Sequence, residues 1–188
     1  CPCRRSGFYP SNVKGRYPSC FKSGTDTHYW RTGEFGRVAR ESTVLEVCVD
    51  TIDGVIAAMK GGAGRVELCS SLSEGGLTPS AGLMHAAAAL PIDCYAMIRP
   101  RSGLFEFSAA EAKIMLSDIA TAQAAGLAGV VLGAQNAEGG LNIPLLKQMM
   151  DTAEGLGTTL HRVIDVVPDP ILALDLAMEL GFDRVLTS

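Results

Sequence analysis

The sequence lacks the features that mark several common protein classes. It holds no run of about 18 apolar residues, so we expect no membrane-spanning helix. Its first residues form no apolar core of the kind found in a secretory signal peptide. No GxGxxG motif or P-loop follows the first predicted strand, which removes the commonest nucleotide-binding folds. The chain begins with cysteine instead of methionine, and we therefore expect a fragment of a longer gene product.

Basic residues are scarce in the larger part of the chain. Residues 1–42 hold 8 Lys and Arg against 3 Asp and Glu, whereas residues 43–188 hold 8 against 17, and the net charge is −4. Because the main part is acidic and offers no extended basic face, we expect no nucleic-acid partner. With 47% hydrophobic and 19% charged residues, the composition is that of a domain able to bury a core.

The six cysteines do not have the spacing of a disulfide framework. Three of them lie in predicted strands as expected buried thiols, which favours a reducing compartment. We therefore expect a cytoplasmic location, with the nucleus as an alternative. In residues 1–42 the spacing of Cys and His matches no common zinc pattern. We predict an irregular, disordered leader over 1–42 and a folded domain over 43–188.

Beyond residue 43, apolar runs alternate strictly with helical patterns. The predicted strands are 45–50, 65–69, 94–99, 129–133, 158–163 and 184–187, with helices between them. Asp50 is expected to cap the first helix, and Ser108 with Glu111 forms a capping box for the third. Glycines 62, 126 and 181 each close a helix before a short turn and a buried strand. This repeated alternation indicates a parallel sheet.

Two architectures fit such a sheet, a doubly wound sheet and a TIM-type (β/α)8 barrel. The connections that follow the strands hold nearly all the unusual residues, whereas the connections that lead into strands are short and plain. A barrel carries its site on all the loops after its strands, while an open sheet gathers ligands at one switch point. The sequence therefore predicts an α/β barrel. Six strands do not close it, so we expect an incomplete barrel of about six βα units.

Five segments together make the chain resemble the copper homeostasis protein CutC family. They are EVCVD (46–50), GAGRVELCSSLSEGGLTPS (62–80), IRPR (98–101), LHRVID (160–165) and GFDRVLTS (181–188). The resemblance implies a TIM-type barrel and a role in copper ion homeostasis, since Cu(I) binding has been proposed for this family. One departure is Leu104, which stands where the family usually has an aspartate.

Strand parity brings two thiols to one face of the sheet. Cys48 lies on the same strand face as Glu46, and Cys69 lies on the same face as Glu67 in the next strand. Because neighbouring strands lie about 4.8 Å apart, the two sulfurs could approach each other near the barrel mouth. Paired thiolates suit Cu(I), and the resemblance implies the same pair of metal ligands. The alternative is two buried and unreactive thiols.

Charged and imidazole side chains form a second candidate cluster. Its members are Glu46, Glu67, Arg99, Arg101, His161 and Asp165. At a barrel mouth they would suit an enzyme that binds a small anionic molecule and moves a proton. The catalytic candidates are Glu67, Arg99, His161 and Asp165, and the ligand-binding candidates are Arg101 and Glu46. The alternative is an internal network of salt bridges.

Three functions therefore remain open. We favour a cytosolic copper-binding protein that holds Cu(I) through Cys48 and Cys69. The alternative is a TIM-barrel enzyme that acts on an anionic small metabolite, so whether the chain is an enzyme is undecided. A truncated form without activity, or with a regulatory role, is the third. The expected partners are a copper ion or a small anionic ligand, and a homo-oligomer is left open.

Overall fold

A single parallel sheet organises the part of the chain that the computed structural model describes, residues 43–188. The predicted leader over 1–42 lies outside the described residues. The sheet has six strands in the order β1-β2-β3-β4-β5-β6, and each strand pairs in parallel with the next one in sequence. The strands are β1 (Glu46–Val49), β2 (Arg65–Leu68), β3 (Asp93–Met97), β4 (Gly129–Leu132), β5 (Gly157–Leu160) and β6 (Arg184–Val185).

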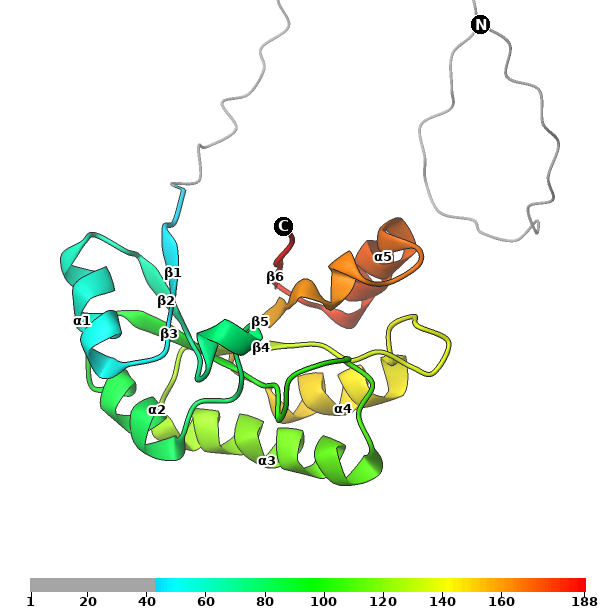
Figure 1. Ribbon diagram of the computed structural model, residues 1–188, viewed down its shortest axis with the longest axis horizontal. Coiled ribbons are helices and arrows are strands. Elements are labelled where there is room, and N and C mark those ends of the chain that lie inside the picture. Colours follow the sequence, from blue (N-terminus) through cyan, green and yellow to red (C-terminus); the bar gives the residue numbers. More distant parts are fainter. Residues whose placement is uncertain (1–42) are drawn as a thin grey trace, which may run out of the picture. The chain divides into compact units, whose positions relative to one another are not determined.

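A helix follows each of the first five strands. The α-helices are α1 (Ile52–Lys60), α2 (Ala81–Ala88), α3 (Ala109–Ala125), α4 (Ile143–Thr152) and α5 (Pro170–Leu180). Two short 3-10 helices, η1 (Leu72–Glu74) and η2 (Arg162–Asp165), lie in the connections after β2 and β5. The helices form an arc around the strands (Figure 1). None of the helices in the described part is long and apolar enough to cross a membrane.

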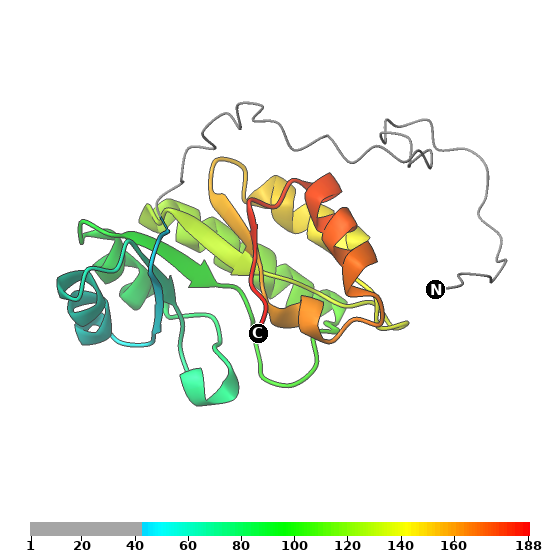
Figure 2. The same cartoon turned by 90° about the horizontal axis from the view of Figure 1, so that it is seen from above.

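The strand order decides between the two predicted architectures. A doubly wound sheet reverses its order at a switch point, whereas here each strand lies beside its sequence neighbours throughout. Seen from above, the strands run in the same direction and the connections that leave them gather at one end (Figure 2). The prediction of an incomplete TIM-type barrel is therefore confirmed, with six strands and five α-helices in residues 43–188.

Local signals in the sequence set most of the helix ends. Ser108 and Glu111 form the predicted capping box, in which each side chain accepts a hydrogen bond from the other residue's backbone N–H. Gly126 and Gly181 close α3 and α5 with φ of 82° and 85°, in the left-handed region that favours glycine. These short-range signals explain why the helix positions follow from sequence.

Several local predictions were wrong. The third and sixth strands end two residues earlier than predicted, at Met97 and Val185. The residue that caps α1 is Thr51, not Asp50, because the Thr51 hydroxyl accepts a hydrogen bond from the Gly54 N–H at 3.1 Å. The fifth strand ends at Leu160 and does not continue to residue 163. His161 ends it, because its side chain caps η2 and thereby replaces strand pairing with a local turn.

The two faces of the sheet have different neighbours. One face packs on the helices and forms the main core, with strand residues Val66, Leu68, Ala96, Val130, Leu132 and Leu160. The opposite face, which we call the inner face, carries a small separate apolar cluster of Cys69, Tyr95, Met97 and Val131. Charged side chains from several strands share this inner face, so it is here that a site must be sought.

Candidate functional site

The amino-terminal half of the inner face holds a closely packed group of side chains, which we call the Tyr95 cluster. Arg65 forms an ion pair with Glu46 at 3.0 Å. The guanidinium groups of Arg65 and Arg184 lie 4.8 and 4.5 Å from the centre of the Tyr95 ring. Arg184 also donates a hydrogen bond to Thr159 at 3.2 Å. Glu46, a predicted ligand-binding residue, therefore takes part in an ion pair away from the carboxyl ends of the strands.

Two glycines make room for the Tyr95 ring. Gly129 of β4 and Gly157 of β5 are partners in the strand register, and a Cβ atom at either position would overlap the ring. Tyr95 is 7% exposed and fills the space that these residues leave. The sequence reasoning missed this cluster, although glycine at the same level of two neighbouring strands is a signal of close approach.

At the carboxyl ends of the strands the same face opens into a cavity of about 200 Å³. It is lined by Cys48, Glu67, Leu72, Gly75, Met97, Arg99, Phe105, His161, Arg162 and Leu186. Three of the four predicted catalytic residues are in this set, together with one of the two predicted thiol ligands. We call this the mouth cavity.

Both predicted thiol ligands contact one carboxylate oxygen. Cys48 Sγ lies 3.5 Å and Cys69 Sγ 3.6 Å from Glu67 Oε1. Cys48 is exposed and Cys69 is fully buried. Desolvation and the neighbouring Glu67 carboxylate raise the pKa of Cys48 to about 12, and they also raise the pKa of Cys69. At neutral pH both sulfurs are therefore thiols, and each can donate its proton to Glu67.

Glu67 is buried and forms no ion pair with a cation in the described part of the chain. The residue is 3% exposed, and its Oε2 atom finds no hydrogen-bond partner within residues 43–188. Burial and the nearby Glu46 carboxylate raise the pKa of Glu67, against the effect of the two thiol hydrogen bonds. A buried carboxylate oxygen without a partner costs free energy unless a ligand satisfies it.

His161 presents one ring nitrogen without a partner. Its Nδ1 accepts a hydrogen bond from the Val163 N–H at 3.2 Å, so the proton of the neutral ring lies on Nε2. Nε2 is buried and finds no partner among the described residues. Complete burial and the charge of Arg99 lower the pKa of His161 to about 3, which keeps the ring neutral. Gly133 leaves space for this ring, since a Cβ there would lie 2.5 Å from its Cε1.

Arg99 is anchored by backbone carbonyl groups. Its Nη1 donates to the carbonyls of Glu74 and Gly76 at 2.9 and 3.2 Å, and its Nη2 donates to that of Gly103 at 2.9 Å. Its Nε is buried and has no partner within the described part. Burial and the neighbouring Arg101 lower the pKa of Arg99. The side chain thus joins two loops, and its positive charge lines the cavity.

Phe105 is a cavity residue that the sequence reasoning missed. Its ring centre lies 4.6 Å from that of His161 and 5.0 Å from the Arg99 guanidinium carbon. An aromatic residue in the connection after β3 could have suggested this position, but its contacts depend on how that connection folds back over the cavity.

Two predicted site residues lie elsewhere. Arg101 pairs with Glu111 at the start of α3 and donates to the backbone carbonyls of Ser102, Leu104 and Glu106. It holds its own loop and does not line the mouth cavity.

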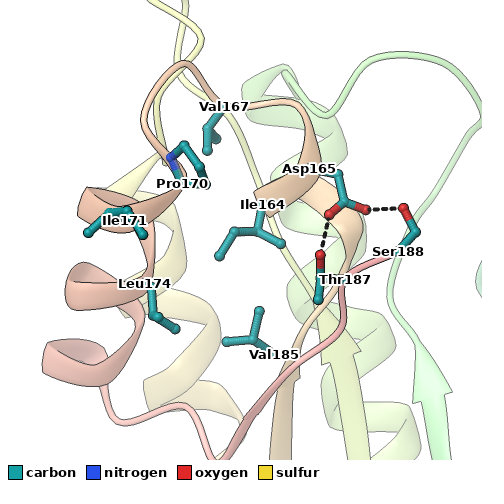
Figure 3. A pocket seen from close by; sticks show the side chains of 9 residues that line it. All are labelled: Ile164, Asp165, Val167, Pro170, Ile171, Leu174, Val185, Thr187 and Ser188. Atoms are coloured by element: carbon teal, nitrogen blue, oxygen red, sulfur yellow. Dashed lines mark hydrogen bonds between the residues drawn. The ribbon is translucent and has the colours of Figure 1, made fainter.

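Asp165 lines a different cavity, of about 570 Å³, beside α5. In Figure 3 its carboxylate is hydrogen-bonded to Thr187 and Ser188, next to an apolar wall that includes Ile164 and Leu174. Hydrogen bonds from Arg162, Thr187 and Ser188 hold the pKa of Asp165 at about 2. Asp165 thus joins Arg162 of η2 to Thr187 and Ser188 in the segment after β6, and the structure does not bring it together with Glu67, Arg99 and His161.

A ready-made site with three or more metal ligands is not found in residues 43–188. Cys48 and Cys69 supply soft sulfur donors that converge on Glu67 Oε1. Such a donor set fits a metal that accepts two sulfur ligands, which Cu(I) does. It does not fit Zn²⁺, whose sites take three or four protein ligands.

The comparisons with known proteins agree with one another. The model of the CutC family matches residues 43–188. A CutC family protein of Sinorhizobium medicae is 58% identical over 145 residues, which are 77% of this chain and 59% of that protein. One from Caulobacter vibrioides is 55% identical over the same length and shares. The chain therefore spans 59% of the length of these curated relatives.

Solved structures give the same answer. The structure from Streptococcus agalactiae, which is named a copper homeostasis protein CutC, superimposes with a TM-score of 0.73 at 31% identity and covers 77% of this chain and 72% of that one. A phosphoenolpyruvate phosphomutase from Streptomyces platensis matches with a TM-score of 0.55 at 15% identity, which shows only the shared fold. Because the family model and close relatives cover the whole described part, this chain belongs to the CutC family.

Proposed function

We propose that this chain acts in copper homeostasis and holds Cu(I) between Cys48 and Cys69. One observation carries the proposal: both sulfurs contact the same oxygen of Glu67, at 3.5 and 3.6 Å. Membership of the CutC family supports it, as does the name of the relative from Streptococcus agalactiae.

The chemistry of the two thiols suits copper as cargo. Cys48 is exposed and gives an incoming ion access, while the buried Cys69 supplies the second sulfur. Binding must displace the thiol protons, because only thiolates are strong metal ligands. The adjacent Glu67 can receive a displaced proton from either sulfur. We place this function in the cytoplasm, where thiols stay reduced.

Titration with Cu(I) tests the proposal. Residues 1–42 contain Cys1, Cys3 and Cys20, so the experiment uses the whole chain with these three changed to serine. In competition with a coloured Cu(I) chelator under reducing conditions, this background should bind one equivalent. Adding Cys48→Ser and Cys69→Ser should abolish that binding.

Cys94→Ser is the matched control. Cys94 is also a buried strand cysteine with a raised pKa, about 11, but it packs in the main core on the helix side of the sheet. This change should leave the stoichiometry at one. Unchanged binding in the Cys48/Cys69 double variant would refute the proposal.

A second candidate function is supported by the polar atoms of the mouth cavity. Glu67 Oε2, Arg99 Nε and His161 Nε2 are buried there without partners in the described part. In an enzyme, Arg99 would attract a negatively charged substrate, His161 would donate a hydrogen bond to it, and Glu67 would accept a proton. Thermal stabilisation of the chain by a small carboxylate, lost in His161→Phe, would support this candidate.

A further inference from the structure

Three residues that line the mouth cavity each carry a buried atom without a partner in the described part, and these atoms define what a ligand must offer. His161 Nε2 and Arg99 Nε carry protons to donate, and Glu67 Oε2 is an acceptor when the carboxylate is ionised. The three residues are 2%, 7% and 3% exposed, so water in bulk cannot easily satisfy them. A matching ligand needs at least one acceptor oxygen and one hydroxyl group.

The charges around the mouth cavity limit which ligands it can bind. Three of the five N–H bonds of Arg99 donate to backbone carbonyl groups, which leaves the Nε–H and one Nη2–H without a partner in the described part. His161 is a neutral donor, and the Glu67 carboxylate faces the same space. A phosphate dianion would bring two negative charges to a space with one positive charge beside a negative one. The cavity therefore suits a neutral compound or a single carboxylate.

The volume and the lining of the mouth cavity set further limits on the ligand. A volume of about 200 Å³ is the space of roughly seven water molecules. Apolar atoms of Leu72, Met97, Phe105 and Leu186 form much of the wall, which favours a short carbon skeleton. The ligand must reach all three polar residues within this volume, so its oxygen atoms lie close together along that skeleton.

We propose that the mouth cavity binds a small hydroxy-carbonyl compound, either a hydroxy acid or a hydroxy ketone. Its carbonyl or carboxylate oxygen accepts hydrogen bonds from His161 Nε2 and Arg99 Nε, and its hydroxyl donates to Glu67 Oε2. The inference deepens the second candidate function by naming the substrate class, and it rests on the mouth cavity being a ligand site. It does not require copper.

Calorimetry on the whole chain tests the class of ligand. The probes are lactate and dihydroxyacetone, which carry the hydroxyl, pyruvate, which lacks it, and inorganic phosphate, which carries more negative charge. Lactate or dihydroxyacetone should bind at least ten times more tightly than pyruvate, because a site built for a hydroxyl rejects an analogue that leaves its acceptor unpaired. They should also bind at least ten times more tightly than phosphate, because the cavity does not balance a second negative charge. Equal binding of all four probes, or binding of none, would overturn the inference.

Variants assign the contacts. Glu67→Gln should weaken lactate at least tenfold and leave pyruvate unchanged, whereas His161→Phe should weaken both. Glu154→Gln and His85→Gln change exposed residues outside the cavity and should change neither. If a cavity variant fails to fold, nitrogen NMR of the unmodified chain replaces it. The His161 Nε2 proton signal should then shift when lactate is added. An unchanged signal would contradict the proposed contact between His161 and the ligand.

The Cys48→Ser/Cys69→Ser variant separates this inference from the copper proposal. Lactate binding that persists after copper binding is lost supports a ligand site of its own. Copper binding in the unmodified chain without binding of any probe overturns the inference and leaves the copper proposal in place.

Discussion

The two halves of the inner face differ in how their glutamates are paired. In the Tyr95 cluster, Glu46 and Arg65 form an ion pair at 3.0 Å, and both arginines of the cluster lie against an aromatic ring. In the mouth cavity, Glu67 and Arg99 form no ion pair among the described residues, and each keeps one buried atom without a hydrogen-bond partner. The Tyr95 cluster also keeps two buried nitrogen atoms without a partner in the described part, Arg65 Nε and Arg184 Nη2, so the contrast lies in the two glutamates: Glu46 has a cation partner and Glu67 has none there.

This difference separates structural residues from candidates for function. A buried charge that finds its partner inside the protein contributes to a fixed arrangement of strands. One that is buried without a partner lowers stability and persists where binding requires it. The comparison therefore predicts that substitutions in the Tyr95 cluster change stability, whereas substitutions in the mouth cavity change binding.

The largest effect on stability should come from Tyr95. Tyr95→Ala removes the ring that both guanidinium groups contact and leaves a cavity opposite Gly129 and Gly157, so we expect a loss of about 3–5 kcal/mol in the free energy of unfolding. Tyr95→Phe keeps the ring and should cost far less. Urea denaturation measures both, and equal losses would show that the ring is not what holds this half together.

The next effect depends on pH and concerns His161. Its pKa is about 3 in the folded protein against an ordinary value of 6.5, so between these values the unfolded chain binds more protons. The free energy of unfolding therefore rises with pH in this window, and about 2 kcal/mol should be lost between pH 7 and pH 5. Asp165, with a pKa of about 2, changes the free energy of unfolding only below about pH 5.

Two histidine variants check this assignment. His161→Gln should flatten the dependence between pH 7 and pH 5, whereas His85→Gln, which changes an exposed histidine on α2, should keep it. If the free energy of unfolding of His161→Gln still falls between pH 7 and pH 5, the imidazole is not the buried neutral donor described above.

The smallest expected effect comes from the same change, Glu to Gln, made once in the Tyr95 cluster and once in the mouth cavity. Glu46→Gln breaks a half-buried ion pair and should cost about 1 kcal/mol. Glu67→Gln removes a buried carboxylate that has no cation partner, so it should leave the free energy of unfolding unchanged or raise it by up to about 1 kcal/mol. Thermal and urea unfolding of the two variants measures this, and a larger loss for Glu67→Gln would reverse the comparison.

Much of the fold could be predicted because its signals are local. The left-handed glycines at 126 and 181 and the capping box at Ser108 act within a few residues, and each marks an element boundary. The end of β5 was missed because it depends on the His161 side chain accepting a backbone hydrogen bond. A strand-forming sequence competes there with a local turn, and apolar periodicity does not reveal which one prevails.

The sequence indicated which strand residues share the inner face, but not how far along the strands each side chain finds its contacts. Alternation places both Glu46 and Cys48 on the inner face, but it does not say that Glu46, two residues earlier and about 6.6 Å lower, meets Arg65. Arg101 does not join the candidate site because it forms an ion pair with Glu111 at the start of α3. These outcomes depend on contacts between distant segments, and parity along one strand holds no information about them.

The central claim is that the sulfur atoms of Cys48 and Cys69 lie close enough together to bind one copper ion. X-ray absorption at the copper edge, on the Cu(I)-loaded chain with Cys1, Cys3 and Cys20 changed to serine, tests it most directly. The account predicts two sulfur neighbours and no nitrogen neighbour, with this signal lost in Cys48→Ser/Cys69→Ser. A histidine nitrogen bound to the metal, or the same two-sulfur spectrum in the double variant, would contradict it.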